Sequence, residues 1–291
     1  MSNTVHVPVL LHECVESLQI KTGGTYVDGT FGGGGHSRAI AEAVGPKGTV
    51  ISIDQDSEAF ERASSWLEQY PIQPVHANFR KLPRILKELS IEKVDGILLD
   101  LGFSSDQLAD EDRGFSFSAS GELDLRFDPT RGEPAWKLVN RLSAKHLADI
   151  IYNYGEERFS RRIAAKIVET RRNQEIRTVQ EFVDLVRSVV PRSKNHRIDP
   201  ATRTMQALRI EVNDELGSLD DALQQFPELL ASGGRFSIIS FHSLEDRRVK
   251  NAFRDHPQLE VVTKKPILPT EEELRVNSRA KSAKLRVAQK A

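Results

Sequence analysis

The stretch YVDGTFGGGGHSRAI (residues 26–40) has five glycines within positions 29–35, although the whole chain of 291 residues contains only 18. Glycine loses more backbone entropy on folding than other residues and buries no side chain, so this cluster needs a local reason. Apolar, strand-like residues precede the cluster and a helical pattern follows it. A flexible linker would lack these neighbours. The sequence therefore favours a tight turn between a strand and a helix, close to a ligand.

Around this turn, strand-like apolar runs alternate with helical stretches. The runs lie at 25–30, 48–56, 74–79 and 94–105. Strands and helices that alternate at this rhythm predict an α/β fold of the Rossmann-like kind, with a doubly wound, mostly parallel sheet.

The rhythm breaks after residue 105 and returns in the last third of the chain. Turn-rich sequence and amphipathic helices fill 106–204, and one long helix is predicted over 206–230. A strand at 235–243 and weaker strands at 259–264 and 283–289 follow. We therefore expect one sheet domain, residues 1–105 and 205–291, which is split by an inserted helical domain, residues 106–204.

The composition is typical of a globular protein, with 38% apolar and 29% charged residues and a net charge of −1. No apolar run approaches the roughly 18 residues that a membrane span requires, so no membrane partner is expected. His12 and Glu13 interrupt the first apolar stretch, which argues against a signal peptide. The single cysteine, Cys14, excludes an internal disulfide and suits a reducing cytoplasm. A cytoplasmic location is therefore expected.

The glycine pattern distinguishes between two nucleotide-like ligands. The fingerprint G-x-G-x-x-G of NAD-binding turns does not fit, because neither register supplies the third glycine. The S-adenosylmethionine pattern, strand-Asp-x-Gly-x-Gly-x-Gly, fits from Asp28 to Gly34 with Thr30 in place of the first glycine. Asp28 suits the ammonium group of a methionine but would repel a pyrophosphate. Asp54 ends the next strand, where its carboxylate can accept hydrogen bonds from ribose hydroxyls.

Further candidate residues stand at the ends of the third and fourth strands. Phe79 is placed either to stack on an adenine or to pack in the core, and the sequence does not decide between the two. The fourth strand ends in DLGFSS, whose Asp100-x-x-Phe103 spacing is similar to the Asp-Pro-Pro-Tyr motif of enzymes that methylate exocyclic amines of bases. Such enzymes need an acceptor for the amine N–H groups and an aromatic face for an extruded base. Asp100, Phe103 and the adjacent Ser104 are therefore candidate catalytic residues.

The strand that ends near residue 243 adds a second polar cluster. Phe241, His242 and Ser243 lie at its end, ahead of Glu245, and are further candidate catalytic residues. A histidine, a serine and an acid would also suit a hydrolase, but the Gly-x-Ser-x-Gly elbow is missing. The histidines show no paired metal spacing, so no metal is expected. Cys14 stands outside any strand-end motif, and methylation of an amine needs no thiol nucleophile.

Basic residues gather in the inserted domain, where residues 158–209 contain 13 Lys and Arg against 5 Asp and Glu. Two regions are candidate RNA contacts. The first is the loop 113–132, in which the alternative is an ordinary loop tied together by Arg–Asp pairs. The second comprises the helices around 158–166 and 197–209, in which the alternative is a set of solvated helix faces. The residues singled out are Phe115, Phe117, Arg126, Arg131, Arg158, Arg161, Arg162, Lys166, Arg197, Arg203 and Arg209.

Taken together, several long motifs closely resemble the bacterial 16S ribosomal RNA (cytosine-N4)-methyltransferase family, also called the RsmH or MraW family. They are DGTFGGGGHS (28–37), DGILLDLGFSS (95–105), LDLRFDPTRG (123–132), YGEERFSRRIA (154–164), DPATRTMQALRI (199–210) and ISFHSLEDRRVK (239–250). The resemblance implies a class I methyltransferase fold with a helical insertion, S-adenosylmethionine as cofactor, and methylation of the N4 amine of one cytidine in 16S rRNA. It also implies cofactor contacts from Gly34, Gly35, His36, Asp54, Phe79, Asp100 and Gln107.

Several alternatives remain open at this stage. The chain could be a small-subunit assembly factor that keeps the cofactor fold without turnover, or a nucleotide-dependent oxidoreductase. The RNA could be recognised within the 30S subunit or in a late assembly particle, and the chain could act as a monomer or a homodimer.

Overall fold

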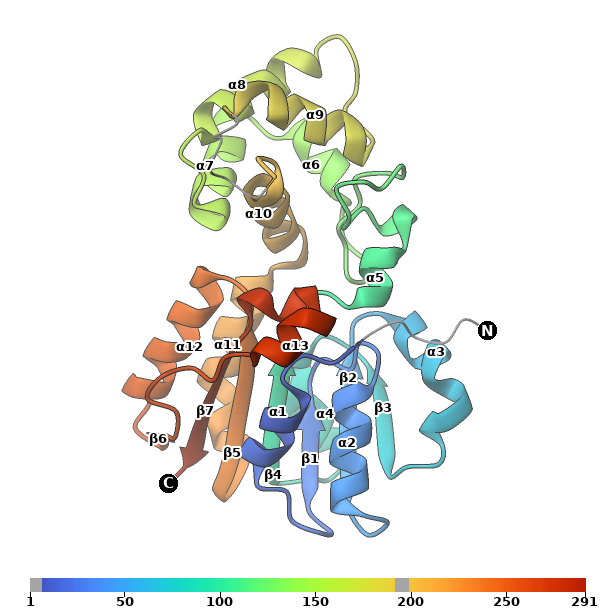
Figure 1. The fold of residues 1–291 in the computed structure, drawn as a ribbon, viewed down its shortest axis with the longest axis vertical. Helices are drawn as coiled ribbons and strands as arrows, with labels where there is room; N and C mark the ends of the chain where they lie inside the picture. Colours follow the sequence, from blue (N-terminus) through green and yellow to red (C-terminus); the bar gives the residue numbers. More distant parts are fainter. Residues whose placement is uncertain (1–6, 192–198) are drawn as a thin grey trace. The chain divides into compact units, whose positions relative to one another are not determined.

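The computed structural model describes residues 7–191 and 199–291 of the chain. These residues form two compact units (Figure 1). The first comprises the described residues up to Asp106 together with Leu216–Ala291, and the second comprises Gln107–Glu215. The second boundary therefore follows helix α10 (Thr202–Asn213), whereas the sequence expectation placed it just before residue 205. Within the described ranges, no helix combines the length and the apolar character needed to cross a membrane.

The first unit is built on a seven-stranded sheet in the order β3-β2-β1-β4-β5-β7-β6. The strands are β1 (Thr25–Asp28), β2 (Thr49–Asp54), β3 (Ile72–His76), β4 (Val94–Asp100), β5 (Leu230–Ser240), β6 (Leu259–Val261) and β7 (Lys284–Lys290). The pairs among β1 to β5 are parallel, and β7 runs antiparallel to both of its neighbours. The strand order reverses between β1 and β4, which is where a doubly wound sheet binds its ligand.

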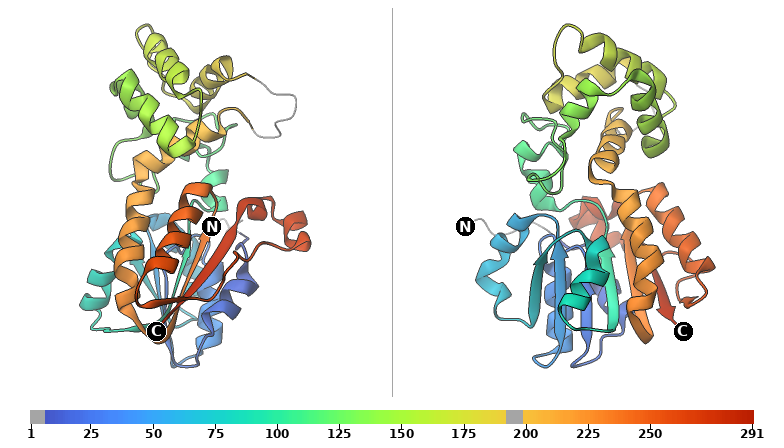
Figure 2. Two further views of the ribbon diagram at one scale, coloured as in Figure 1. Left: turned by 90° about the vertical axis from the view of Figure 1, so that its left-hand side faces the viewer. Right: turned by 180° about the vertical axis from the view of Figure 1, so that it is seen from behind.

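Helices cover both faces of this sheet (Figure 2). They are α1 (Leu11–Leu18), α2 (Gly35–Val44), α3 (Ser57–Leu67), α4 (Leu82–Glu88), α11 (Glu215–Leu229), α12 (Ser243–Asp255) and α13 (Glu271–Val276), with the 3-10 turns η1 (Phe79–Lys81) and η3 (Ser278–Ser282). One core joins α1 and α2 to the sheet, and a second core on the other face joins α4, α11 and α12. Alternate residues of a strand enter opposite cores, as in Val50 and Ile51 of β2.

Three local expectations differ from the structure. Phe79 does not end a strand but begins the 3-10 turn η1, because Asn78 caps the turn by accepting from the Arg80 amide. The expected long helix over 206–230 is two helices, because Asp214 adopts a left-handed φ of 47° and ends α10. Strand β5 begins at Leu230 rather than 235, because Leu230 already pairs with Val94 of β4.

The second unit is helical. Its elements are η2 (Glu111–Arg113), α6 (Ala135–Arg141), α7 (Ala144–Gly155), α8 (Ser160–Thr170), α9 (Val179–Val189) and α10, while the short helix α5 (Ser105–Ala109) crosses the boundary between the units. Helix α9 begins with a capping box, in which Thr178 and Glu181 each bond the other's backbone amide. Arg197, a candidate RNA contact, lies outside the described residues.

Candidate functional site

Three aspartates end three neighbouring strands at one edge of the sheet. Asp54 ends β2, Asp28 ends β1 and Asp100 ends β4, in the order in which these strands lie side by side. Since the strands are parallel, their carboxyl ends meet at the same edge. This edge is also the topological switch point of the sheet, so the three acids surround the place where a nucleotide-like ligand binds.

The glycine-rich turn between β1 and α2 is tightly enclosed at Gly34. This residue caps α2 with a φ of 78°, and a Cβ built on it would lie 2.6 Å from both Phe31 Cζ and Trp66 Cζ2. Only glycine meets both conditions without strain. On the next residue, Gly35, a Cβ would lie 2.8 Å from Cγ of Pro8. The N-terminal segment therefore packs directly against the turn.

Asp54 holds the turn through its main chain. Its Oδ2 accepts from the Gly32 amide at 2.7 Å, and its Oδ1 accepts from the Asp56 amide at 2.8 Å. Burial raises the pKa of Asp54 to about 6, against the lowering effect of these two hydrogen bonds. Each carboxylate oxygen has a second lone pair, so Asp54 can still accept from a ligand hydroxyl.

Asp28 has a more internal position than expected. Its side chain is fully buried and accepts from Ser37 Oγ at 2.6 Å and from the Thr30 amide at 3.1 Å. Burial raises its pKa, and the charge of His36 opposes that rise. These contacts shape the turn. The expected contact of Asp28 with a ligand ammonium would therefore require the turn to move.

Asp100 carries an acceptor that receives no hydrogen bond from any residue that the structure describes. Its amide donates to Thr30 Oγ1 at 2.6 Å, and its Oδ2 lies 3.9 Å from His36 Nδ1. Its Oδ1 is buried and has no hydrogen-bond partner among the described residues. Burial raises the pKa of Asp100 to about 6, and the charges of His36 and Arg279 oppose the rise. A buried acceptor of this kind can accept from an ordered water or from a donor of a ligand.

Phe79 packs into the core beneath the site. Its side chain is 8% exposed, and its ring meets Phe226 edge-on with the centroids 6.5 Å apart. A Cβ on Gly29 would lie 3.2 Å from Phe79 Cβ. Most of the Phe79 ring is therefore packed in the core, which is one of the two alternatives that the sequence left open. A contact between its exposed edge and an adenine stays a prediction.

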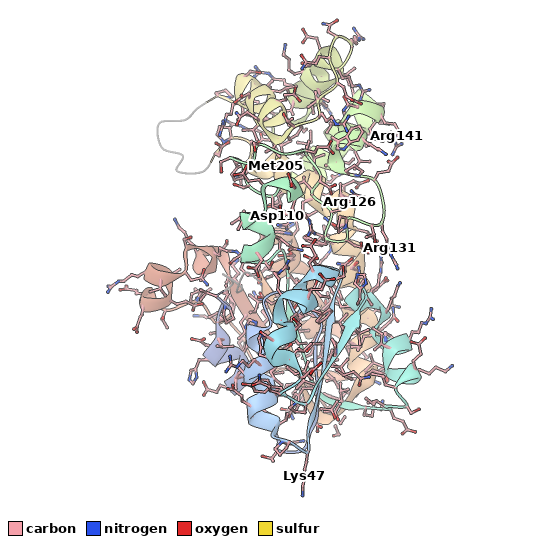
Figure 3. The ribbon with its side chains drawn as sticks, turned by 90° about the vertical axis from the view of Figure 1, so that its right-hand side faces the viewer. Lys47, Asp110, Arg126, Arg131, Arg141 and Met205 are labelled. Atoms are coloured by element: carbon pink, nitrogen blue, oxygen red, sulfur yellow. The ribbon has the colours of Figure 1, made fainter. Side chains whose placement is uncertain are left out.

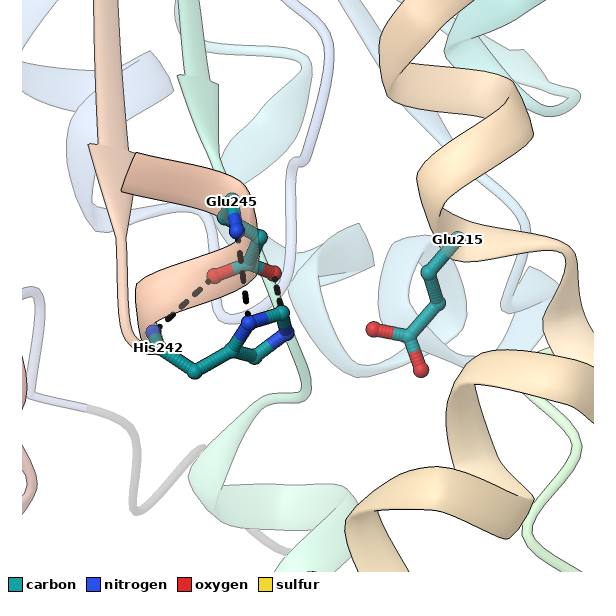
Figure 4. Close-up of side chains that lie close together, drawn as sticks. All are labelled: Glu215, His242 and Glu245. Atoms are coloured by element: carbon teal, nitrogen blue, oxygen red, sulfur yellow. Dashed lines mark hydrogen bonds and ion pairs between the residues drawn. The ribbon is translucent and has the colours of Figure 1, made fainter. Parts of the chain in front are cut away.

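The polar cluster after β5 is first of all a helix cap. His242 caps α12, because its Nδ1 accepts from the Glu245 amide at 3.3 Å (Figure 4). In return, Glu245 Oε2 accepts from the amides of Phe241 and His242 at 2.8 and 3.2 Å. Since Nδ1 is an acceptor, a neutral His242 carries its proton on Nε2. This Nε2 lies 3.2 Å from Glu245 Oε1 but makes no hydrogen bond within the described residues.

The loop after β4 lies against both neighbouring motifs. A Cβ on Gly32 would lie 3.7 Å from Cβ of Ser104, and a Cβ on Gly102 would lie 3.8 Å from Cδ2 of Phe241. The sequence-predicted candidates Ser104 and Phe241 are thus brought to the same edge of the sheet as the glycine turn. Ser243 is the first residue of α12. Gln107 begins the second unit, so its expected cofactor contact stays a prediction.

Two residues of this site carried no signal that the sequence analysis used. Thr30 looked like a departure from the glycine pattern, yet its hydroxyl accepts from the amide of Asp100. Arg279 lies far along the chain and contacts the β4 loop at Phe103 and Ser105. Residues 274–291 contain six Lys and Arg and no Asp or Glu, but a local pattern could not tell which of these cations contacts the site.

In the second unit, several candidate RNA contacts are engaged within the unit itself. Phe115 is buried and stacks on Phe127 with the centroids 5.8 Å apart. Arg126 makes a bidentate pair with Asp124, at 2.8 and 2.6 Å, which is the ordinary-loop alternative. Arg209 pairs with Glu215 at 2.7 Å and its side chain is only 11% exposed. We therefore remove Phe115, Arg126 and Arg209 from the candidate RNA contacts.

Other cations of this unit remain exposed. Figure 3 labels Arg131 and Arg141, which lie on the same side of the unit. Their side chains are 71% and 59% exposed, although each lies beside a carboxylate, of Asp128 and Glu133 respectively. Phe117 is half-buried. Lys166 pairs with Glu169 at 3.2 Å, and Arg203 donates to the carbonyl of Glu156 at 3.4 Å.

The N-terminus of α8 differs from these paired sites. Arg158, Arg161 and Arg162 are all exposed, and the guanidinium groups of Arg158 and Arg162 lie 4.7 and 5.5 Å from the ring centroid of Phe159. Within the described residues none of the three arginines makes an ion pair. Cations in the first turn of a helix oppose its dipole, so this arrangement is unfavourable for the helix itself. It is favourable for an anionic partner.

The raised pKa values predict an unusual pH dependence of stability. Asp54 and Asp100 titrate at about 6 in the folded protein, above the value of 3.8 for an ordinary aspartate. Between these values the folded protein binds more protons than the unfolded chain, so this contribution to stability is lost as pH rises through about 6. Urea titrations of the ligand-free protein should give a free energy of unfolding roughly 1–2 kcal/mol higher at roughly pH 5.5 than at pH 7.5.

The double variant Asp54→Asn/Asp100→Asn is the control for this prediction, because its two amides do not titrate. The difference between the two pH values should be smaller by that amount in the variant. An equal difference in the two proteins would show that other groups dominate.

The sheet order, with one reversed strand between β5 and β6, and the glycine turn beside three strand-end acids define a class I methyltransferase. The match to known proteins is more specific. A family model described as the MraW methylase family matches residues 3–291, and the chain belongs to this family.

Three relatives illustrate how far the similarity extends. The ribosomal RNA small subunit methyltransferase H of Rhodopirellula baltica is 48% identical over 300 residues, which cover 99% of this chain and 92% of that protein. The protein of the same name from Thermomicrobium roseum is 48% identical, with 99% and 94% covered. The one from Cyanothece sp. is 49% identical, with 98% and 95% covered.

Proposed function

We propose that this protein transfers a methyl group from S-adenosylmethionine to the exocyclic N4 amine of a cytidine in the 16S RNA of the small ribosomal subunit. Its relatives are named for methylation of that RNA, and its motifs resemble those of the cytosine-N4 enzymes. The observation that carries the proposal is the buried Oδ1 of Asp100 at the end of β4, to which no residue of the described ranges donates. An amine N–H of a substrate base supplies such a donor.

The residues at the sheet edge fit S-adenosylmethionine. Asp54 would accept from the ribose hydroxyls, and the main chain at Gly34 and Gly35 would lie beside the methionine part. His36 is buried, and its Nε2 lies 3.0 Å from the Val9 carbonyl, so it would support this turn from below. When bound, the cofactor supplies a methyl group on a positively charged sulfur, which is already electrophilic. The protein therefore acts mainly by aligning the amine with that methyl group.

The chain's own groups favour an aligned amine. The N4 lone pair of cytosine is delocalised into the ring, and an acceptor on an N4 hydrogen helps to localise it. Asp100 would be that acceptor, and with a pKa of about 6 it can also take the proton that leaves after the N–C bond has formed. The Nε2–H of His242 would suit the acceptor atoms of the same base. Phe103 and Phe241 would hold the extruded base by stacking.

The exposed arginines at the start of α8 would bind RNA phosphates. We expect the double charge reversal Arg161→Glu/Arg162→Glu to weaken RNA binding and to reduce the salt dependence of log K by roughly 1.5, since about two phosphate contacts are lost. The affinity for S-adenosylmethionine should stay unchanged. Fluorescence anisotropy with a small-subunit RNA fragment at several salt concentrations measures the first effect, and calorimetry measures the second.

Arg84→Glu is the matched control for charge, because Arg84 is exposed on α4 of the other unit and pairs only with Glu88 among the described residues. It should change RNA binding little. A comparable loss of RNA affinity in this control would mean that general charge, rather than the start of α8, governs binding.

We further propose that the natural substrate is the RNA within the 30S subunit or a late assembly particle in the cytoplasm, and that the second unit recognises this RNA. Comparison of naked 16S RNA, assembled 30S subunits and assembly intermediates as methyl acceptors distinguishes these substrates. Sedimentation of the free protein will report whether two chains associate as a homodimer.

The direct test uses small subunits from cells that lack this methylation. The protein and methyl-labelled S-adenosylmethionine should transfer label to their 16S RNA, and mass spectrometry of the nucleosides should identify N4-methylcytidine. Label on a ring carbon or a ribose would refute the proposed chemistry. Tight binding of the particle and the cofactor without transfer would instead indicate an assembly factor.

A further inference from the structure

Residues 270–283, which form α13 and η3, touch two separate parts of the site. We call this stretch the 270–283 segment. Ala280 and Ala283 are buried in the same core as Val9 and Leu10 of the N-terminal segment. The 270–283 segment is therefore packed against the protein, and its polar side chains reach the loops at the sheet edge.

Its first contact is with the loop after β4. Arg279 donates to the carbonyl of Phe103 and, at 2.8 Å, to the hydroxyl of Ser105. Its guanidinium carbon also lies 5.3 Å from the ring centroid of Phe103. One side chain thus contacts the main chain and the ring of Phe103 and the side chain of a second loop residue. The planar guanidinium can make all of these contacts at once, which an ammonium group cannot.

The loop needs such support because it begins with a flexible residue. Gly102 has a φ of 96°, and it directly precedes Phe103. Because glycine has no Cβ, it can adopt many φ and ψ angles, so Gly102 alone does not fix the direction of the residues that follow it. Contacts to Phe103 and Ser105 therefore limit where the loop carries its aromatic ring.

The second contact is with the N-terminal segment. Glu273 Oε1 accepts from the Leu10 amide at 2.8 Å, and Asn277 Nδ2 donates to the Val7 carbonyl at 3.2 Å. The carbonyl of Val9 lies 3.0 Å from His36 Nε2, and Pro8 packs under the glycine turn. Glu273 and Asn277 therefore contact the segment that packs against the cofactor side of the site. Arg279 contacts the loop beside which the methyl acceptor would lie.

We propose that Arg279 is a positioning residue, which fixes the Phe103–Ser105 loop so that the extruded base meets the methyl group in line. The inference rests on the proposed function for its consequence in catalysis. In structural terms, Arg279 of the 270–283 segment holds the loop after β4 in place, and Glu273 of the same segment holds the N-terminal segment that packs against the glycine turn.

The charge of Arg279 has a second effect, on Asp100. Among the charged groups that act on that carboxylate, His36 and Arg279 favour its ionised form and lower its pKa, while Asp28 and Glu245 raise it. Removal of the Arg279 charge should therefore raise the pKa of Asp100 and move the acidic limb of the rate profile to higher pH. A variant that keeps the charge should leave the limb in place.

The test compares Arg279→Gln, Arg279→Lys and Glu273→Ala in the full-length protein. In Arg279→Gln, kcat at saturating substrates should fall about tenfold or more, because misplacement of the acceptor is costly. The affinity for S-adenosylmethionine should change less than about threefold, and the acidic limb should move up. Arg279→Lys should lose rate but keep the position of the limb. Glu273→Ala should show the opposite split, with weaker cofactor binding and a smaller loss of kcat.

Hydrogen exchange of the ligand-free protein gives a readout that needs no RNA. Arg279→Gln should speed exchange in the peptide covering residues 101–109 and leave the peptide covering 25–36 unchanged. Arg275→Gln is the matched control, because the Arg275 side chain is 79% exposed and lies 3.9 Å from Glu271 alone among the described residues. It should behave as the parent protein does.

Parent-like exchange in Arg279→Gln, or a loss of cofactor affinity as large as its loss of kcat, would overturn the inference. If the parent protein methylated no RNA, the proposed function would fail on its own. The exchange result would still decide whether Arg279 orders the loop.

Discussion

Replacement of Asp100 by asparagine is expected to lower the rate of methyl transfer by about 100- to 1,000-fold, the range found when one preorganised polar group is removed from a reacting centre. The asparagine side chain has nearly the same shape as aspartate. The loop, and the hydrogen bond from the main-chain N–H of residue 100 to Thr30 Oγ1, should therefore persist. However, an amide carries no negative charge, and it cannot take up the proton that leaves N4. Single-turnover transfer of label to small-subunit RNA measures this effect.

The ligand-free Asp100→Asn protein should also be more stable than the parent at neutral pH, because it no longer buries a carboxylate whose Oδ1 has no hydrogen-bond partner among the described residues. Thermal unfolding measures this difference, and loss of function with gain of stability is typical of an active-site polar group. Asp220→Asn is the control, because Asp220 is exposed on α11 and pairs with Arg248. A transfer rate within a few-fold of the parent in Asp100→Asn would remove Asp100 from the proposed chemistry.

Replacement of Asp54 by alanine is expected to weaken S-adenosylmethionine binding by about 1.5–3 kcal/mol, or roughly 10- to 150-fold in Kd, for the loss of a charge-assisted hydrogen bond. The loss should lie toward the upper end, because Asp54 also anchors the amides of Gly32 and Asp56. Calorimetry with S-adenosylmethionine measures it. Unchanged affinity would place the ribose elsewhere.

S-adenosylhomocysteine adds a sharper comparison, because it shares the ribose but lacks the positive charge on sulfur. Asp54→Ala should weaken both ligands by a similar factor, since the ribose is common to them. Asp100→Asn should weaken the charged cofactor more than the neutral product. The reverse pattern would exchange the roles proposed for these two acids.

The local sequence predicts the frame of this site well. The alternation of apolar runs predicts a parallel sheet, and the structure confirms it with five parallel strands in the order β3-β2-β1-β4-β5. Since parallel strands end at one edge, the positions of Asp28, Asp54 and Asp100 at strand ends follow from the pattern alone. The glycine cluster likewise lies between a strand and a helix, as its neighbours in the sequence require.

Contacts between distant segments could not be predicted in this way. Arg279 is 176 residues from Phe103, and the two meet in a fold in which the 270–283 segment packs against the N-terminal segment. Periodicity describes which face of an element is buried, but it does not say where a long side chain at the surface will reach. The role of His242 shows a related limit. The residue looked catalytic from its place at a strand end, and the same place is where a helix cap is needed.

The last strand of the sheet occupies an interior place, since β7 lies between β5 and β6. During synthesis on the ribosome, β5 emerges well before β7, so the edge of β5 that pairs with β7 has no partner until β7 has left the ribosome. The unpaired main-chain N–H and C=O groups of an open strand edge can pair with another chain. We therefore expect released chains that are truncated before β7 to aggregate or to recruit chaperones.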